Sequence, residues 1–143
     1  MSDAPLRQAS TRFTIETRGK GLVEFTEEVA RWLAERRVDE GLLTLFCRHT
    51  SASLLVQENA APAVRRDIAA YFERLAPEGA GYEHDDEGPD DMPAHLRTAL
   101  TATSLAIPVA GGRMVLGTWQ GLYLFEHRRR PHRREIAAHL MGA

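Results

Sequence analysis

Residues 41–56 read Gly-Leu-Leu-Thr-Leu-Phe-Cys-Arg-His-Thr-Ser-Ala-Ser-Leu-Leu-Val, two apolar runs separated by a polar segment. The first run, residues 41–47, is β-compatible and too short for an independent helix, so it predicts a strand buried on both faces. The second run, residues 54–56, predicts another strand. Because a polar segment between two buried strands is a typical place for a pocket floor, residues 48–53 are candidate site residues.

The rest of the chain supplies further strands and three helices. Alternating or apolar runs predict strands at residues 12–18, 22–25, 104–109, 114–119, 122–125 and 135–140. Helices are predicted at residues 26–37 with Thr26 as the cap, at residues 62–75 with an apolar stripe in the core, and at residues 93–103 with Asp91 as the cap. Gly111-Gly112 predicts a hairpin connection. The fold class is therefore α+β, a mostly antiparallel sheet covered by helices on one side.

Composition limits the classes of protein that this chain can belong to. With 143 residues and 43% hydrophobic residues, it is long enough for one core, so we expect one domain over residues 1–143. A formal charge of -2 argues against a dedicated nucleic-acid binder. Cys47 is the only cysteine, which excludes an intrachain disulfide, and no apolar run has the length of a signal peptide or membrane span. We expect a cytoplasmic protein with no membrane partner.

Residues 82–95 form an acidic segment that contains six carboxylates and two histidines. Glycine and proline interrupt it, which predicts a polar loop that enters a helix. Like charges at this density repel one another unless water, arginines or a metal ion offsets the repulsion. The segment is therefore either a solvated acidic loop with two incidental histidines, or a metal site with His84 and His95 as ligands.

Three histidines from separate parts of the chain are the ligand set that we favour: His49, His84 and His95. A catalytic metal usually needs three protein ligands and an open position. The spacing of these histidines matches no compact metal motif, so each taken alone also fits a satisfied polar residue. Nearby aspartates would orient the imidazoles, or would supply oxygen ligands to a harder ion. The expected cofactor is a divalent ion, either zinc or magnesium.

Two later segments carry other candidate site residues. Residues 117–121 place Trp119 and Gln120 between glycines, which fits either a ligand wall or a β-bulge with a core tryptophan. His127 and Arg128 follow a predicted strand and would bring positive charge to a phosphate. The remaining arginines through Arg134 fit a solvated or interface rim.

Several short motifs together resemble the YjbQ family, in order and over nearly the whole chain. They are His-Thr-Ser-Ala-Ser at 49–53, Glu-Asn at 58–59, His-Asp-Asp-Glu-Gly at 84–88, Asp-Asp-Met-Pro-Ala-His at 90–95, Thr-Ser-Leu at 103–105, Gly-Thr-Trp-Gln-Gly at 117–121 and Glu-His-Arg at 126–128. Members of that family are often described as secondary thiamine-phosphate synthases. The resemblance implies a mixed, mostly antiparallel sheet curled into a half-barrel, a homotrimer with sites near subunit boundaries, and a histidine-rich pocket that can hold a metal ion.

The resemblance also implies which residues lie at the pocket. It places His49, His84 and His95 there, with five others nearby: Ser51, Ser53, Asp91, Gln120 and His127. The chain departs from the family pattern at residues 129–134, where Pro131 and extra arginines replace a smaller glycine-containing turn. The resemblance therefore does not determine the rim of the site or the identity of the substrate.

Three functions follow as hypotheses. The first is a thiamine-phosphate synthase-type transferase that joins two small phosphorylated substrates with loss of pyrophosphate. In it the three histidines hold the metal, His127, Arg128, Ser51 and Ser53 contact phosphate, Gln120 binds substrate and Trp119 stacks on the pyrimidine. His49, Asp91 and His127 are its candidate catalytic residues.

The second hypothesis is a metal-dependent phosphate or ester hydrolase with Asp91 or Glu58 as base. The third is a non-catalytic trimer that binds a metal or small ligand.

Overall fold

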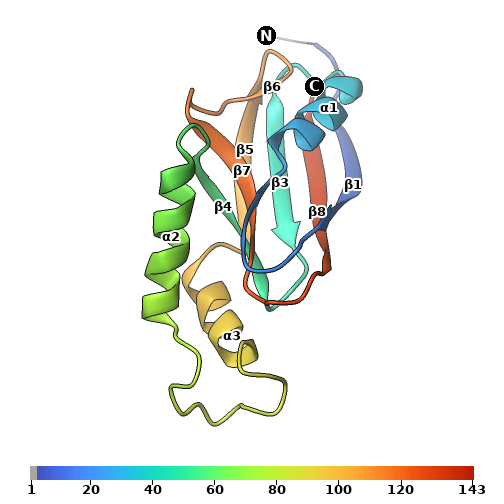
Figure 1. The fold of residues 1–143 in the computed structure, drawn as a ribbon. Coiled ribbons are helices and arrows are strands. Elements are labelled where there is room, and N and C mark those ends of the chain that lie inside the picture. Colours follow the sequence, from blue (N-terminus) through green and yellow to red (C-terminus); the bar gives the residue numbers. More distant parts are fainter. Residues whose placement is uncertain (1–2) are drawn as a thin grey trace.

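A computed structural model describes residues 3–143, which form eight strands and three helices (Figure 1). The strands are β1 (Arg7–Glu16), β2 (Gly21–Glu24), β3 (Gly41–Cys47), β4 (Ala52–Glu58), β5 (Ser104–Ala110), β6 (Arg113–Met114), β7 (Gln120–Glu126) and β8 (Arg133–Gly142). The helices are α1 (Thr26–Arg36), α2 (Pro62–Leu75) and α3 (Asp91–Leu100). The predicted α+β class and the three predicted helices are confirmed.

The strands form two antiparallel sheets. One has the order β1-β8-β3-β5-β6 and curls into a half-barrel, and the other has the order β2-β7-β4. Every strand pair in the described chain is antiparallel, so the sheet is not mixed. A bridge between Leu54 and Ala102 ties the segment after α3 to β4. Both sheets therefore end close to the start of α3 and the acidic loop before it (Figure 1).

The core fills the space inside the curl, between the two sheets and α1. Leu43 on β3 faces Leu140 and Ile107 on the neighbouring strands, and all three are buried. Val29 and Leu33 of α1 close the same cluster. Burial of this apolar surface is the main favourable term in folding, at roughly 25 cal/mol per Å².

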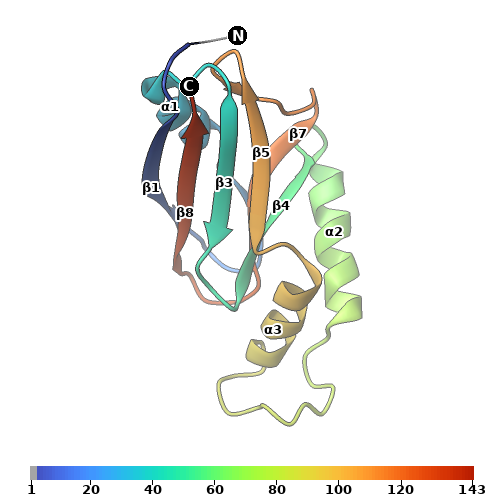
Figure 2. The ribbon, with the colours of Figure 1, turned by 180° about the vertical axis from the view of Figure 1, so that it is seen from behind.

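The outer face of β3 corrects the prediction of a strand buried on both sides. Leu43, Leu45 and Cys47 point inward, but Leu42 is 46% exposed and Phe46 is 48% exposed. Figure 2 shows this outer face of the five-stranded sheet, and no helix crosses it. Residues 41–47 are all apolar or nearly so because one face of β3 lies in the core and the other is an apolar face that no other part of the described chain covers.

The segment after the Gly111-Gly112 hairpin also differs from its prediction. Both glycines have positive φ, at 60° and 74°, as the predicted turn requires. The returning strand β6 has only two residues, however, and residues 115–119 form a loop that reaches β7. Since Trp119 is 62% exposed, it is not a core residue.

The helices begin and pack differently from the predictions. Thr26 is the first helical residue of α1, and its hydroxyl accepts from the backbone of Leu122 instead of capping the helix. Asp91 is likewise the first residue of α3 and not its cap. The stripe on α2 contacts the small sheet through Phe72, whose ring meets Phe125 edge-on, but no residue of α2 is fully buried. The apolar stripe of α2 therefore packs against the sheet but is only partly buried.

No helix in the described part of the chain is long and apolar enough to cross a membrane. The longest, α2, has 14 residues, whereas a spanning helix needs about 20 apolar ones.

A buried polar layer lies where β7 ends and β8 begins. Glu126 is fully buried and accepts hydrogen bonds from Thr17 Oγ1 at 2.7 Å and Arg134 Nε at 2.8 Å. Burial alone would raise the pKa of Glu126, but the hydrogen bonds from Arg134 and Thr17 outweigh it and lower the pKa. The layer joins β1, β7 and β8 through a carboxylate that stays charged.

His127 belongs to the same layer and is also fully buried. Its Nε2 lies 2.8 Å from Ser53 Oγ, which in turn lies 2.6 Å from Thr101 Oγ1. Burial, followed by the positive charge of Arg97, lowers the pKa of His127 to about 3. At neutral pH the imidazole is therefore uncharged and supports the fold.

The depressed pKa of His127 predicts acid destabilisation. Between about pH 6.5 and pH 3 the unfolded chain binds one proton at this histidine that the folded chain does not, so stability falls as the pH falls. The expected slope from this residue is at most about 1.4 kcal/mol per pH unit. His127→Gln should flatten the pH dependence of the unfolding free energy measured by urea denaturation, and Ser53→Ala should retain it. Equal slopes for the wild type and His127→Gln would contradict the assignment.

Candidate functional site

The acidic loop and the first turns of α3 bring four possible metal ligands together. His84 and Glu87 come from the loop, and Asp91 and His95 from the helix. One ligand atom from each lies within 4.8 Å of the others. Asp91 and His95 share a helix face because they are four residues apart. We call these four residues the ligand group.

Asp91 is the centre of the ligand group. Its Oδ2 lies 2.9 Å from His84 Nε2 and 3.2 Å from His95 Nε2. His84 Nε2 also lies 3.0 Å from Glu87 Oε2. The side chain of Asp91 is only 5% exposed, whereas those of His84 and His95 are 43% and 33% exposed. The group therefore has a buried base and an accessible outer side.

The backbone fixes the orientation of the His95 ring. His95 Nδ1 lies 3.1 Å from the carbonyl oxygen of Thr50, which can only accept, so Nδ1 carries the proton. Unless Nε2 is also protonated, its lone pair faces the carboxylate of Asp91. Two acceptors at 3.2 Å require a proton or a cation between them. A carbonyl that holds one ring nitrogen while the other faces a metal is a common arrangement for histidine ligands.

Arg128 holds the inner side of the ligand group. Its Nη1 lies 2.7 Å from Asp91 Oδ1, its Nε lies 3.0 Å from Asp90 Oδ2, and its Nη2 lies 3.0 Å from the carbonyl of Glu87. These contacts join the end of β7 to the loop and to α3. Arg128 therefore positions carboxylates, and its donors are not directed to a phosphate as predicted.

The charges of the ligand group stabilise one another. Burial alone would raise the pKa of Asp91, but the hydrogen bond from His84 and the charges of His95 and Arg128 outweigh it and lower the pKa. The hydrogen bond to Asp91 in turn raises the pKa of His84. The group therefore contains an ionised carboxylate with two imidazoles beside it. Two histidines and two carboxylates form a donor set typical of zinc and similar ions, and less typical of magnesium, which prefers oxygen.

His49 lies outside the ligand group, although the sequence placed it among the metal ligands. Its Nε2 accepts a hydrogen bond of 2.8 Å from the backbone N–H of Glu135 on β8. Burial and then the charge of Arg134 lower the pKa of His49. The ring is neutral and bound to the sheet, so the nitrogen that a metal would need is occupied.

Glu87 belongs to the ligand group, although no sequence pattern predicted it. It lies three residues after His84 in the same loop, and its carboxylate meets the same imidazole nitrogen. The signal was present as His84-x-x-Glu87, but nothing in the sequence distinguished Glu87 from the other acids of the loop.

The predicted serine contacts lie in the buried layer and not in an open site. Ser53 is fully buried against His127, and Ser51 Oγ accepts from Arg134 Nη2 at 3.0 Å. Neither hydroxyl is directed to the ligand group. Together with the burial of His127, this removes Ser51, Ser53 and His127 from direct contact with a substrate in this structure.

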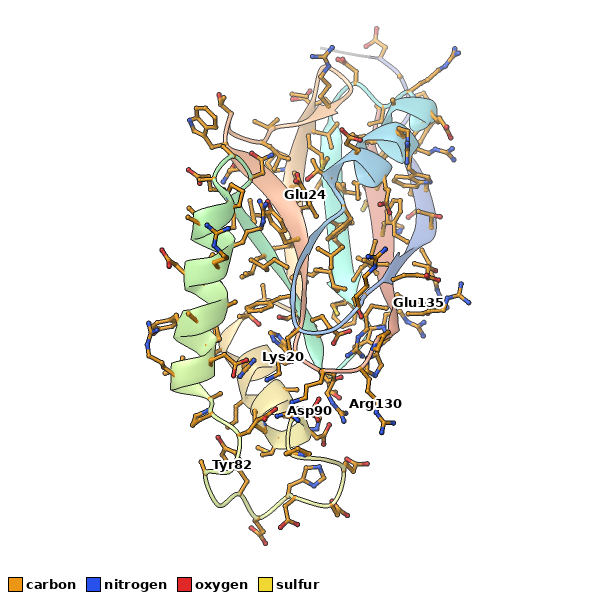
Figure 3. The ribbon with its side chains drawn as sticks, in the orientation of Figure 1. Lys20, Glu24, Tyr82, Asp90, Arg130 and Glu135 are labelled. Atoms are coloured by element: carbon orange, nitrogen blue, oxygen red, sulfur yellow. The ribbon has the colours of Figure 1, made fainter. Side chains whose placement is uncertain are left out.

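Trp119 and Gln120 lie at the opposite end of the small sheet. Gln120 pairs with Glu58 at one end of β7 and β4, and Glu126 pairs with Ala52 at the other. Six strand steps separate these ends, about 20 Å. Figure 3 accordingly shows Glu24, which neighbours the Gln120 end, far above Asp90. Within one chain, the structure does not bring Trp119 or Gln120 to the ligand group.

Three hollows among the described residues border the ligand group. One of them, of about 440 Å³, shares Tyr82, His84, Asp85 and Met92 with the first of the two described next. The first, the acidic hollow, has a volume of about 620 Å³ and is lined by Tyr82, Glu83, His84, Asp85, Asp86 and Met92. The second, the threonine hollow, has a volume of about 700 Å³ and is lined by His95 and by residues from segments 46–50 and 98–103. The ligand group is therefore reachable from two sides of different chemical character.

The family model described as UPF0047 protein YjbQ-like matches residues 11–143. A UPF0047 protein of Synechocystis is 51% identical over 142 residues, which are 99% of this chain and 97% of that protein. The UPF0047 protein YjbQ of Escherichia coli O157:H7 is 45% identical and covers 90% of this chain and 94% of its own.

Solved structures agree with these sequence relatives. A conserved hypothetical protein from Thermus thermophilus superposes with a TM-score of 0.80 at 34% identity, covering 90% of this chain and 97% of that chain. A YbjQ-like protein of unknown function from Sulfolobus solfataricus reaches a TM-score of 0.90 at 21% identity, covering 97% and 100%, which bears on the fold alone. The extent and identity of the sequence matches establish that this chain belongs to the UPF0047 YjbQ-like family.

Proposed function

We propose that the chain is a metal-dependent enzyme for a small phosphorylated substrate, with a divalent ion held by His84, Glu87, Asp91 and His95. The observation that carries this proposal is the face-to-face arrangement of His95 Nε2 and Asp91 Oδ2, two acceptors 3.2 Å apart with the proton of His95 committed to Thr50. Either a proton on Nε2 or a cation between the two atoms resolves this contact, and we assign a cation because four donor atoms converge there. Zinc or a similar ion suits the mixed nitrogen and oxygen donors better than magnesium.

The residues around the group have separate tasks. Thr50 fixes the tautomer of His95, and Arg128 holds Asp91 by the oxygen that does not face the histidines. Ligands that are oriented in this way lose little freedom on binding an ion. A bound divalent ion supplies Lewis-acid stabilisation of negative charge on a phosphoryl oxygen. The exposed sides of His84 and His95 leave room for a substrate next to it.

Two reactions fit such a site. The first is condensation of the thiamine-phosphate synthase type, in which diphosphate leaves one substrate and the nitrogen of the other attacks the exposed carbon. The second is hydrolysis of a phosphate or ester. One observation favours hydrolysis: the guanidinium of Arg128 is occupied by Asp90 and Asp91, so it does not offer its charge to a leaving diphosphate. Glu58 cannot be the base at this group, because it lies at the far end of β4.

Metal binding should depend on the helix ligands. We expect untagged protein to bind about one equivalent of zinc by isothermal titration, and His95→Ala to weaken binding by at least tenfold, as is usual for the loss of one ligand or its support. Asp85→Asn is the matched control, since it removes a carboxylate from the same loop but outside the ligand group. Undiminished binding by His95→Ala would overturn the proposal.

Turnover separates the candidate reactions. Metal-loaded protein should form thiamine phosphate from the aminopyrimidine diphosphate and the thiazole phosphate if the first reaction is correct, or release phosphate from a monoester if the second is. His95→Ala should abolish either activity, with its circular dichroism spectrum unchanged. Metal and substrate binding without turnover of either substrate would instead identify a binding protein.

We further propose that the protein is a homotrimer. The uncovered face of the five-stranded sheet supports self-association, because Leu42, Phe46 and Met141 are 46%, 48% and 44% exposed there. Leu42 is the Cα partner of both Met141 and Pro108, so the apolar side chains are contiguous across three strands. Contiguous apolar surface on a sheet face is typical of an interface.

A charge on this face should dissociate the assembly. We expect Leu42→Glu to shift the molecular mass measured by sedimentation equilibrium from three chains to one, because an unpaired carboxylate cannot be buried in an apolar interface without a large cost. Val115→Glu places the same charge on an exposed loop position outside the sheet and should leave the mass unchanged. A single-chain mass for the wild type would refute the trimer.

A further inference from the structure

The acidic hollow and the threonine hollow beside the ligand group differ in charge. The acidic hollow is lined by the carboxylates of Glu83, Asp85 and Asp86, with no lysine or arginine among its lining residues. The threonine hollow has no carboxylate among its lining residues and contains Arg48. An anion approaching the ligand group is therefore repelled on one side and attracted on the other.

Arg48 is placed to contact a ligand. Its side chain is 41% exposed and pairs with Glu135 through Nη1. Within residues 3–143, the hydrogen bonds of this side chain are limited to that one contact, so Nε and Nη2 remain available. Because a guanidinium can bind two oxygens side by side, Arg48 can bind a phosphate while it keeps its contact with Glu135.

His49 lines the threonine hollow and is held there by the backbone of the sheet. Its Nε2 accepts from the backbone of Glu135, so its proton must be on Nδ1. Nδ1 lies 3.5 Å from Nη1 of Arg134, which is also a donor. Because Arg134 is buried and does not line the hollow, this contact belongs to the buried polar layer, and Arg48 is the arginine that the hollow presents.

The remaining lining residues complete a polar pocket with one apolar wall. Thr103 adds a hydroxyl-bearing side chain, and Thr98 Oγ1 is a buried oxygen that has no hydrogen-bond partner among the described residues. Phe46 is a half-exposed aromatic side chain at the edge of the same hollow. Such a pocket suits a molecule with an anionic group at one end and a flat apolar group at the other.

We propose that the threonine hollow, and not the acidic hollow, is the substrate subsite, and that it binds the phosphate or diphosphate group of a small metabolite at the guanidinium of Arg48. The inference rests on the proposed function and specifies it. His95 lines the same hollow and belongs to the ligand group, so a phosphorylated molecule bound there reaches the ion without crossing the carboxylates of the loop.

The test uses inorganic pyrophosphate as the probe and the full chain kept free of metal with a chelator that is then removed. We expect amide chemical-shift changes at residues 48–50 and 98–103 on titration. Arg48→Gln should weaken binding at least tenfold, as expected for the loss of a charged hydrogen-bond donor. Arg48→Lys should bind with intermediate affinity, because it retains the charge and loses the paired donors.

Two controls give the result its meaning. Arg66→Gln removes the same charge from an exposed position on α2 and should leave affinity unchanged. Asp86→Asn alters the acidic hollow and should not weaken binding either. Unchanged affinity in Arg48→Gln, or shift changes centred on residues 83–86, would overturn the inference.

Failure of the subsite is distinguishable from failure of the metal proposal, since the two use separate titrations. Arg48→Gln should bind zinc like the wild type, because Arg48 is outside the ligand group. Pyrophosphate bound at Arg48 by a wild type that binds no zinc would refute the proposed function and keep the subsite. Zinc binding without pyrophosphate binding at Arg48 would refute the subsite and keep the metal centre.

Discussion

The contact of Arg128 with Asp90 and Asp91 is the constraint on which the site depends. One guanidinium, fixed at the end of β7, holds two adjacent carboxylates at the start of α3. Without that positive charge, the six acids of residues 82–95, which include Asp91 at the start of α3, would repel one another. The ion pairs therefore determine where the loop ends and the helix begins, and they direct the other oxygen of Asp91 toward His84 and His95.

The fold separates the buried charged groups around Glu126 from the solvent-accessible charged groups of the ligand group. Glu126, Arg134 and Thr17 form a buried set in which every carboxylate oxygen has a donor, and His127 stays neutral beside it. The ligand group lies outside that set, where its histidines reach solvent. The first arrangement stabilises the junction of β1, β7 and β8, and the second leaves donor atoms free for a ligand. Three consecutive residues thus contribute to different regions: Glu126 and His127 to the buried layer, and Arg128 to the ligand group.

Sequence patterns predicted most of the fold because two-residue and helical periods record burial directly. At residues 41–47 they predicted the strand correctly but not its burial, since in a sequence an apolar side chain on an uncovered sheet face cannot be distinguished from one in the core. For the site, His84 and His95 were found because each lies in an acidic segment next to a helix start. The structure places His49 outside the ligand group and Glu87 inside it. The sequence did not reveal this choice, because it depends on which backbone N–H or carbonyl meets each ring, and for His95 and Thr50 that tertiary contact spans 45 residues.

The ligand group draws half of its members from a helix and half from a loop. Asp91 and His95 are held rigidly by α3, whereas His84 and Glu87 belong to a glycine- and proline-containing segment whose position costs conformational entropy. Around the proposed ion, the helix pair would set the geometry of coordination, and the loop pair would set how much ordering accompanies it. Lengthening the segment between α2 and α3, or changing its glycine content, would therefore tune affinity through chain entropy while every coordinating atom stayed the same.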